Sequence, residues 1–251
     1  MRTLAFPLLF MFIFLDISSQ VNDSKVNIGL SFNPHLSGQT YYFPTGSENL
    51  KVIFDTQVRL GWTAGVSIRR TMSDRISFQT GIYLSTKGYA SHYQFQLNDT
   101  IIDLLMAEEG KYPKEAYSKS NHYFYDVPLA LNWLIYNGHT LNYYANFGLI
   151  TNIYVAAEGL YITDFSDESQ DIRYMHLNHG QLRKDYMVRM LNLSGFLAIG
   201  IERSINSSYG LFLEPNFDMS ILPLHNSNGL SSKTPRPRYY NIGIRIGILF
   251  C

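Results

Sequence analysis

Eight charged residues lie at alternate positions of stretches that are otherwise apolar or built from small residues. They are Arg59, Arg69, Lys87, Asp126, Glu202, Glu214, Asp218 and Arg245. Acids and bases enclosed in one space can form a polar path or relay protons. They can also pair with one another, because an unpaired buried charge is costly. We favour the second interpretation, and expect these eight side chains to fill a closed interior as a lumen polar network.

Histidine is the commonest acid–base catalyst, so the seven histidines are the next candidates. They are His35, His92, His122, His139, His176, His179 and His225. His176 and His179 share one connection with Ser166 and Asp171, but no sequence motif orders them. The sequence has no Gly-x-Ser-x-Gly motif, no phosphate-binding loop and no zinc-ligand spacing. We therefore expect surface histidines and a non-enzymatic protein with no catalytic residues and no cofactor. A lipid-modifying hydrolase or transferase is the enzymatic alternative.

Four acidic residues close in sequence are the candidate metal ligands. They are Asp164, Asp167, Glu168 and Asp171. Carboxylates grouped in this way can bind calcium. Their spacing matches no calcium-loop signature, so we expect solvated loop charges and no metal site.

The elements that would position these residues are β-strands, and the clearest runs from Tyr239 to Phe250. Six apolar or aromatic residues occupy one face of this segment: Tyr240, Ile242, Ile244, Ile246, Ile248 and Phe250. The other face is mostly small or polar: Tyr239, Asn241, Gly243, Arg245, Gly247 and Leu249. Successive strand side chains point to opposite faces. One apolar and one polar face are typical of a barrel that stands in lipid.

Similar alternation predicts eight strands, near residues 25–34, 57–70, 75–89, 122–136, 140–157, 187–204, 208–221 and 238–250. Short turns fall at 70–74, 137–139 and 206–208, and Asn137-Gly138 is a strong hairpin signal. Long connections fall at 36–56, 90–121, 158–186 and 222–237. The alternation of Tyr93, Phe95 and Leu97 has two interpretations: an extracellular hairpin that continues the third strand, or two additional strands. The predicted fold is an all-β, up-and-down antiparallel transmembrane β-barrel of about eight strands, with ten as the alternative.

Glycine decides which face lines the lumen, because a soluble barrel with an apolar interior would also alternate. The polar face carries Gly29, Gly61, Gly65, Gly81, Gly148, Gly200, Gly243 and Gly247. On a solvated exterior these glycines would only weaken the strands. Inside a narrow barrel they make room for large polar side chains. Pro128 and Pro215 interrupt predicted strands and favour bulges there, and Phe196 on the polar face leaves a bulge or a register slip open.

Composition supports a membrane barrel exported from the cytoplasm. The chain is 46% hydrophobic and 15% aromatic, with 19 tyrosines and 16 phenylalanines, and its 20 basic and 20 acidic residues balance. Arg2 and the apolar residues 4–15 predict a signal peptide over residues 1–19, which leaves residues 20–251 as the barrel domain. The single cysteine, Cys251, forms no internal disulfide. We expect a monomer in outer-membrane lipid, with no nucleic-acid partner.

Several short segments resemble the PorT-like outer-membrane β-barrel family of the Bacteroidota type. They are Tyr83-Leu84-Ser85-Thr86-Lys87-Gly88-Tyr89, Tyr125-Asp126-Val127-Pro128-Leu129, Gly200-Ile201-Glu202, Leu213-Glu214-Pro215 and Tyr239-Tyr240-Asn241-Ile242-Gly243-Ile244. The resemblance covers residues 26–250 and implies an outer-membrane barrel without an agreed activity. One member takes part in a secretion system. The sequence thus predicts a structural or binding protein that presents long external loops, with an accessory subunit of a secretion or envelope complex as the alternative.

Overall fold

The structure is a computed structural model that describes residues 26–42, 51–96, 106, 109–138, 140–178, 189–223 and 236–250. The predicted signal peptide lies outside these residues, as do His139, His179, His225 and Cys251. Among the described residues, no helix is long and apolar enough to cross a bilayer.

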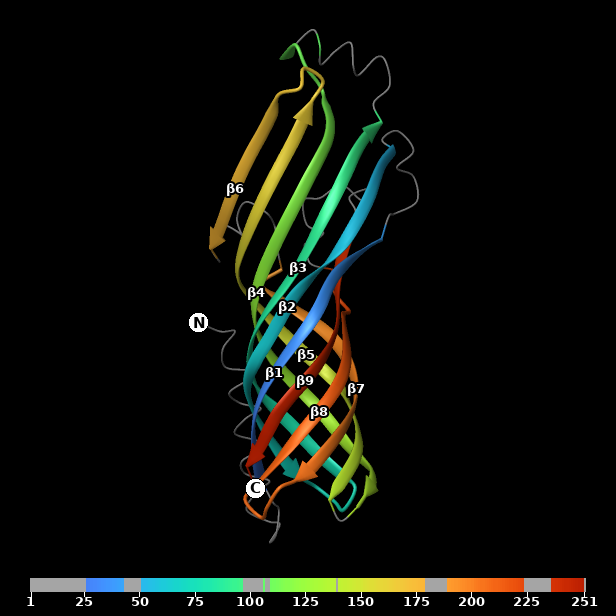
Figure 1. Cartoon of the computed structure of the whole chain (residues 1–251), viewed down its shortest axis with the longest axis vertical. Helices are drawn as coiled ribbons and strands as arrows, with labels where there is room; N and C mark the ends of the chain where they lie inside the picture. Colours follow the sequence, from blue (N-terminus) through green and yellow to red (C-terminus); the bar gives the residue numbers. More distant parts are fainter. Residues whose placement is uncertain are drawn as a thin grey trace.

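Nine β-strands account for almost all of the described residues. They are β1 Val26–Tyr42, β2 Lys51–Thr71, β3 Ile76–Gln96, β4 Pro113–Asn137, β5 Leu141–Phe165, β6 Gln170–Asn178, β7 Leu191–Ser204, β8 Tyr209–Ser220 and β9 Arg236–Phe250. They form one antiparallel sheet in the order β4-β3-β2-β1-β9-β8-β7-β5-β6, and β4 also pairs with β5. That last pairing closes eight strands into a barrel, while β6 stands outside the ring (Figure 1). The predicted up-and-down barrel is confirmed.

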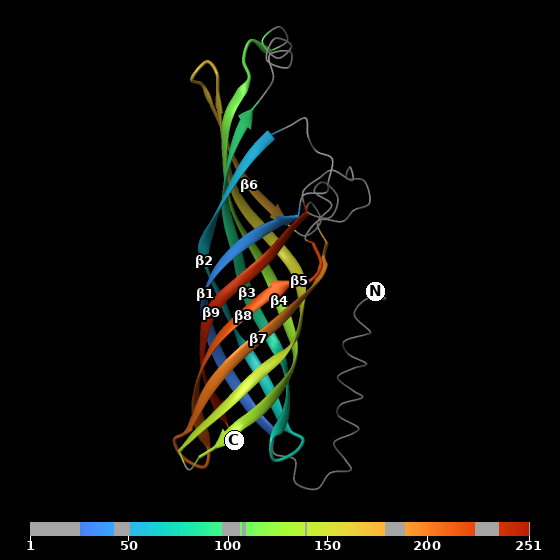
Figure 2. The ribbon, with the colours of Figure 1, turned by 90° about the vertical axis from the view of Figure 1, so that its right-hand side faces the viewer.

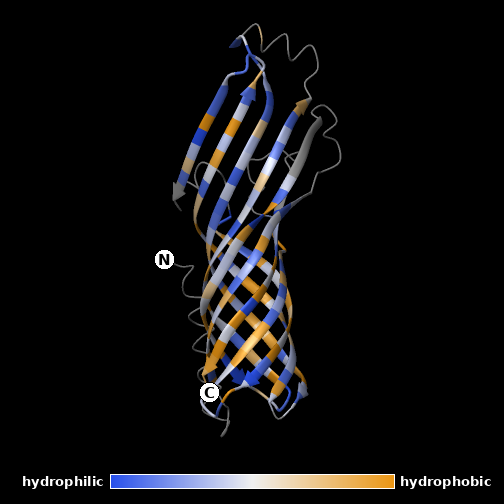
Figure 3. Ribbon diagram, in the orientation of Figure 1, coloured by the Kyte–Doolittle hydropathy of each residue, from blue (hydrophilic) through white to orange (hydrophobic). Residues whose placement is uncertain are grey.

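The two faces of the wall follow the alternation in the sequence. In β9, Ile242, Ile244 and Ile246 point outward and are exposed, whereas Asn241 and Leu249 are buried in the lumen. Apolar residues are concentrated in the lower half of the molecule, where the strands close into the barrel (Figure 3). Because all the strands pair around the ring, the backbone hydrogen bonds of this region are satisfied within the wall, as lipid requires.

Several strands are longer than the sequence predicts. A strand crosses a bilayer with about 9–11 residues, yet β4 and β5 have 25 residues each. The surplus continues past the barrel as a twisted sheet made from the upper parts of β2, β3, β4 and β5, with β6 at its edge (Figure 2). Strands therefore occupy 90–96 and 113–121 of the first predicted connection and 158–165 and 170–178 of the second, and β3 continues as the predicted hairpin required. We call this projecting part the upper sheet.

The two prolines inside strands do not produce the predicted bulges. Pro128 pairs with Ile150, and Pro215 pairs with Ile244, in unbroken register. A proline removes only its own N–H from the ladder, and the neighbouring pairs hold the strand in place. Phe196 is buried in the lumen and β7 pairs with β5 without a slip. The register shifts lie elsewhere, for example between Val58 and Trp62 in the β2–β3 pairing.

Close packing inside the barrel explains why glycines line the polar face. A Cβ atom on Gly200 would collide with the ring of Tyr144, and one on Gly247 with the ring of Phe212. The rings occupy the space that the absent side chains leave, so glycine allows large residues to fill a narrow barrel.

Candidate functional site

The lowest layer of the lumen, near the short turns, is an ion pair between β2 and β7. Nη1 of Arg69 lies 2.6 Å from Oε2 of Glu202. The guanidinium also lies over the ring of Tyr144, 5.3 Å from its centroid. Arg69 and Glu202 come from strands on different sides of the barrel, so this pair spans the interior instead of tying neighbouring strands.

The middle layer joins β8 and β9. Nη1 of Arg245 donates to Oε1 of Glu214 over 2.8 Å, and Nδ2 of Asn146 donates to the other carboxylate oxygen over 3.2 Å. The Arg245 guanidinium lies 5.7 Å from the centroid of the Tyr83 ring. Glu214 is almost fully buried, and both of its oxygens have donors.

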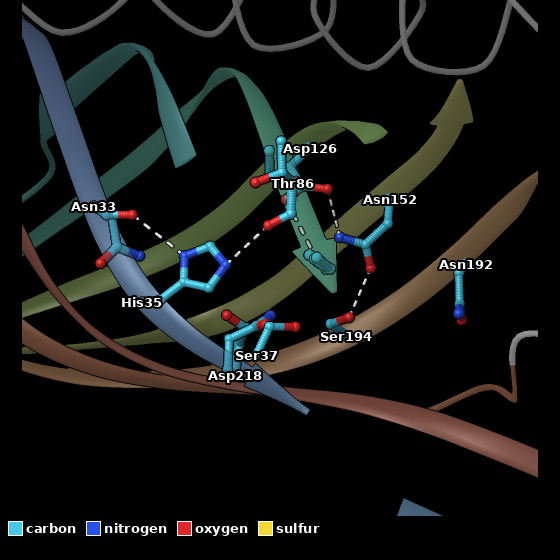
Figure 4. Close-up of polar contacts among 12 residues, drawn as sticks. Asn33, His35, Ser37, Thr86, Asp126, Asn152, Asn192, Ser194 and Asp218 are labelled. Carbon is cyan, nitrogen blue, oxygen red and sulfur yellow. Dashed lines mark hydrogen bonds and ion pairs between the residues drawn. The ribbon is translucent and has the colours of Figure 1, made fainter. Parts of the chain in front are cut away.

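The upper layer is a chain of polar contacts that ends on Asp126 (Figure 4). Nζ of Lys87 lies 3.5 Å from Oδ2 of Asp126, to which the Ser85 hydroxyl also donates. Nδ2 of Asn152 donates to Oδ1 of Asp126 over 2.6 Å, and the Ser194 hydroxyl donates to Asn152 over 2.6 Å. Side chains from β3 and β5 thus contact the carboxylate on β4, and Ser194 on β7 holds Asn152 in place.

Asp218 and His35 lie near this layer but do not form an ion pair of their own. Oδ1 of Asp218 accepts from Nδ2 of Asn241 over 2.7 Å. The ring nitrogens of His35 lie 3.2 Å from the Asn33 carbonyl oxygen and 3.1 Å from that of Thr86 (Figure 4). The expectation of surface histidines is wrong for His35, because β1 continues beyond the predicted end at residue 34 and turns this position inward. The polar alternation through Asn33, His35 and Ser37 was the sequence signal for it.

Arg59 does not join the ion pairs. It lies within the register shift between Val58 and Trp62, and its Nη1 donates to Oδ1 of Asn121 and to the Ser120 carbonyl. A side chain on Gly88 would contact Asn121 and narrow the space beside Arg59. The structure therefore brings six of the eight predicted residues into three ion pairs. Asp218 instead accepts a hydrogen bond from the Asn241 amide, and Arg59 links β2 to β4.

Aromatic rings close the lumen above these layers. Phe124 and Tyr154 pack edge to face with their centroids 4.8 Å apart, and Tyr239 lies 6.1 Å from Phe124. His122 is buried beside them, hydrogen-bonds to the Tyr154 hydroxyl and stacks on Tyr89. This second histidine also contradicts the surface expectation, since β4 begins at Pro113 and carries His122 into the wall. An eight-stranded barrel is just wide enough for side chains to fill, and here ion pairs and rings fill it.

A barrel with this wall and this interior has a known setting. Its outer face is apolar, its inner face is polar, and its strands close without an edge, as in the barrels of bacterial outer membranes. The chain is an outer-membrane β-barrel protein. The short turns, the beginning of β1 and the end of β9 lie at one rim, and the upper sheet rises from the other rim (Figure 2). In such barrels short turns face the periplasm and long segments face outside.

The upper sheet carries the remaining candidate residues. Nε2 of His92 lies 2.9 Å from Oε2 of Glu115, and Nδ1 of His176 lies 3.5 Å from Oε1 of Glu158. These pairs are on different parts of the sheet and involve no serine nucleophile. Tyr174 is 81% exposed at the edge strand β6.

The acidic cluster lies at the β5–β6 turn and is distributed among separate partners. Asp164 accepts from Gln170, Asp167 from Ser169, and Asp171 from Arg173. The hydrogen bond from the Ser169 side chain holds the pKa of Asp167 below its usual range. The described residues contain no group of three or more side chains placed to bind a metal ion.

Comparisons with known proteins give a likeness of fold only. No protein-family model and no curated protein matches the sequence. Neisserial surface protein A has 8% identity over 90% of this chain and 99% of that chain, with a TM-score of 0.31. Ail, the attachment invasion locus protein of Yersinia pestis, has 7% identity over 89% of this chain and 99% of that chain, with a TM-score of 0.34. The outer membrane protease OmpT from Escherichia coli has 7% identity over 92% of this chain and 99% of that chain, with a TM-score of 0.43. The resemblance to the PorT-like family has no support in these comparisons beyond the outer-membrane barrel class.

Proposed function

We propose that this protein is a non-enzymatic outer-membrane barrel that presents the upper sheet to a binding partner outside the cell. The observation that carries the proposal is the continuation of β4 and β5 far beyond the length that crosses a bilayer. Strands that continue from a closed barrel fix where the upper sheet stands, and a surface that is already ordered loses little entropy on binding.

The packed interior of the barrel supports a role as the stable base of the upper sheet. Arg69–Glu202, Arg245–Glu214 and Lys87–Asp126 are close pairs, and the aromatic layer lies above them. A binding protein needs a stable base for its contact surface, and side chains that pair across the lumen supply one.

The dispersal of the histidines supports the non-enzymatic part of the proposal. Among the described histidines, His35 contacts backbone carbonyls, His122 contacts Tyr154, and His92 and His176 each face a different glutamate. A histidine, a serine and a carboxylate converging at one rim would instead support a lipid-modifying enzyme.

The experiment that tests the proposal places a photo-crosslinking amino acid at Tyr174 in intact cells, followed by purification in mild detergent. We expect capture at Tyr174 and none at Ser208, a matched exposed position in a short turn at the opposite rim. Capture at Ser208 alone would overturn the proposal and indicate a periplasmic partner, as for an accessory subunit of an envelope complex. A lack of capture at both positions would also contradict it.

A further inference from the structure

β6 is an edge strand of the upper sheet. Among the described residues it pairs only with β5 (Figure 1). The Phe165 N–H donates to the Ser169 carbonyl, and antiparallel ladders alternate between bonded and non-bonded pairs. Residues 171 and 173 therefore bond to β5, while the N–H and C=O groups of Gln170, Ile172 and Tyr174 point away from it.

This edge lacks several of the devices that protect natural edges from another strand. The nine residues of β6 include neither proline nor lysine and pair with β5 without a register shift, which leaves charges such as Asp171 and Arg173 as its protection. Ile172 is 50% exposed and Tyr174 is 81% exposed. An unpaired edge with exposed apolar side chains between complementary charges is a template for strand addition.

The charges of β6 are self-complementary. Asp171 and Arg173, on either side of Ile172 in the sequence, share one face of β6, and Nη2 of Arg173 lies 2.6 Å from Oδ2 of Asp171. Two antiparallel copies of β6 pair so that residues with outward N–H and C=O groups face one another, either about such a residue or about an inward residue between two of them. A centre on Asp171 or on Arg173 would set like charges opposite each other, which is unfavourable. Centred on Ile172, the pairing sets Asp171 of each copy opposite Arg173 of the other, at the closely spaced non-bonded positions. Centred on Tyr174, it would set Arg173 opposite Met175 and Asp171 opposite Leu177.

We propose that β6 pairs antiparallel with β6 of a second copy of this chain, in the register centred on Ile172. This rests on the proposed function, since it names the partner of the upper sheet. β6 runs from the tip of the upper sheet towards the barrel (Figure 1). Copies in one membrane carry β6 in the same direction, so an antiparallel pair joins copies in two facing membranes. Each barrel remains a monomer in its own membrane, and many weak edge contacts act together between the surfaces.

The first test is disulfide crosslinking of the full-length protein in proteoliposomes, with Cys251→Ser as the background. Under mild oxidation Ile172→Cys should give a covalent dimer between vesicles, because the two side chains lie directly opposite each other. Tyr174→Cys faces Gln170 in this register and should give none. A dimer from Tyr174→Cys, or none from Ile172→Cys, would overturn the register or the contact.

The second test measures clustering of the same vesicles by light scattering. Asp171→Arg should abolish clustering because it sets arginines opposite each other, and Asp171→Arg with Arg173→Asp should restore it. Tyr174→Pro should abolish clustering while the barrel stays folded, since it removes an outward N–H only. Clustering that survives Asp171→Arg would sink the proposal. If photo-crosslinking at Tyr174 captures a different protein while vesicles do not cluster, this inference fails and the proposed function stands.

Discussion

Arg245 on β9 and Glu214 on β8 meet in the middle of the barrel, with Nη1 2.8 Å from Oε1. Neither partner is placed there by its immediate sequence neighbours, which are all apolar. The two strands pair with Glu214 opposite Arg245, so strand register alone brings the charges together. The same register explains how a wall built for lipid carries a polar interior.

This relationship predicts an asymmetric response to mutation. Glu214→Gln leaves the buried Arg245 without its carboxylate, and breaking such a pair should cost about 3–5 kcal/mol of unfolding free energy. Glu214→Gln with Arg245→Met removes both charges and should recover most of that loss. Urea unfolding in lipid vesicles measures both. If the double variant is as unstable as the single one, the pair does not act as a unit.

Two glycines of β7 should differ sharply in their tolerance of alanine. Gly200→Ala places a methyl group against the Tyr144 ring, and such overpacking costs about 1–3 kcal/mol. Gly195→Ala is the matched control, because its nearest side-chain atom is 3.9 Å away, on Ile221. Folding is followed by the shift in gel mobility on heating. Tyr144→Leu should rescue Gly200→Ala, and equal effects at both glycines would contradict the packing.

The position of the membrane predicts where an arginine is tolerated. Ile244→Arg faces lipid near the middle of the wall, where an arginine costs about 2–4 kcal/mol. Ile172→Arg has a similar exposed fraction but lies on the upper sheet, so it should leave the unfolding free energy nearly unchanged. Equal losses at the two positions, measured in vesicles, would mean that the upper sheet is also in lipid.

The barrel could be predicted from the sequence because the two-residue period fixes which face each side chain occupies. The alternation of Ile242, Ile244 and Ile246 with Asn241, Gly243 and Arg245 places all six as the structure does. The glycines identified the lumen for the same reason, since a ring such as Tyr144 needs an absent side chain beside it.

The upper sheet could not be predicted in the same way. Outside the membrane both faces of a strand meet water or loops, so β6 and the upper parts of β4 and β5 have no apolar face to mark them. Irregular pairing between strands could not be predicted either. The sequence places Arg59 with the lumen charges, but it lies in a register shift and hydrogen-bonds to Asn121 instead. His35 was missed because the predicted first strand ended too early, and His122 because the predicted fourth strand began only at that residue.

The central claim is that a closed barrel holds the upper sheet outside the cell and the short turns inside the periplasm. Labelling of single cysteines in a Cys251→Ser background with a membrane-impermeant maleimide tests this most directly. In intact cells Tyr174→Cys should react fully and Ser208→Cys should react only after the outer membrane is permeabilised. Labelling of Ser208→Cys in intact cells, with Tyr174→Cys protected, would contradict the account.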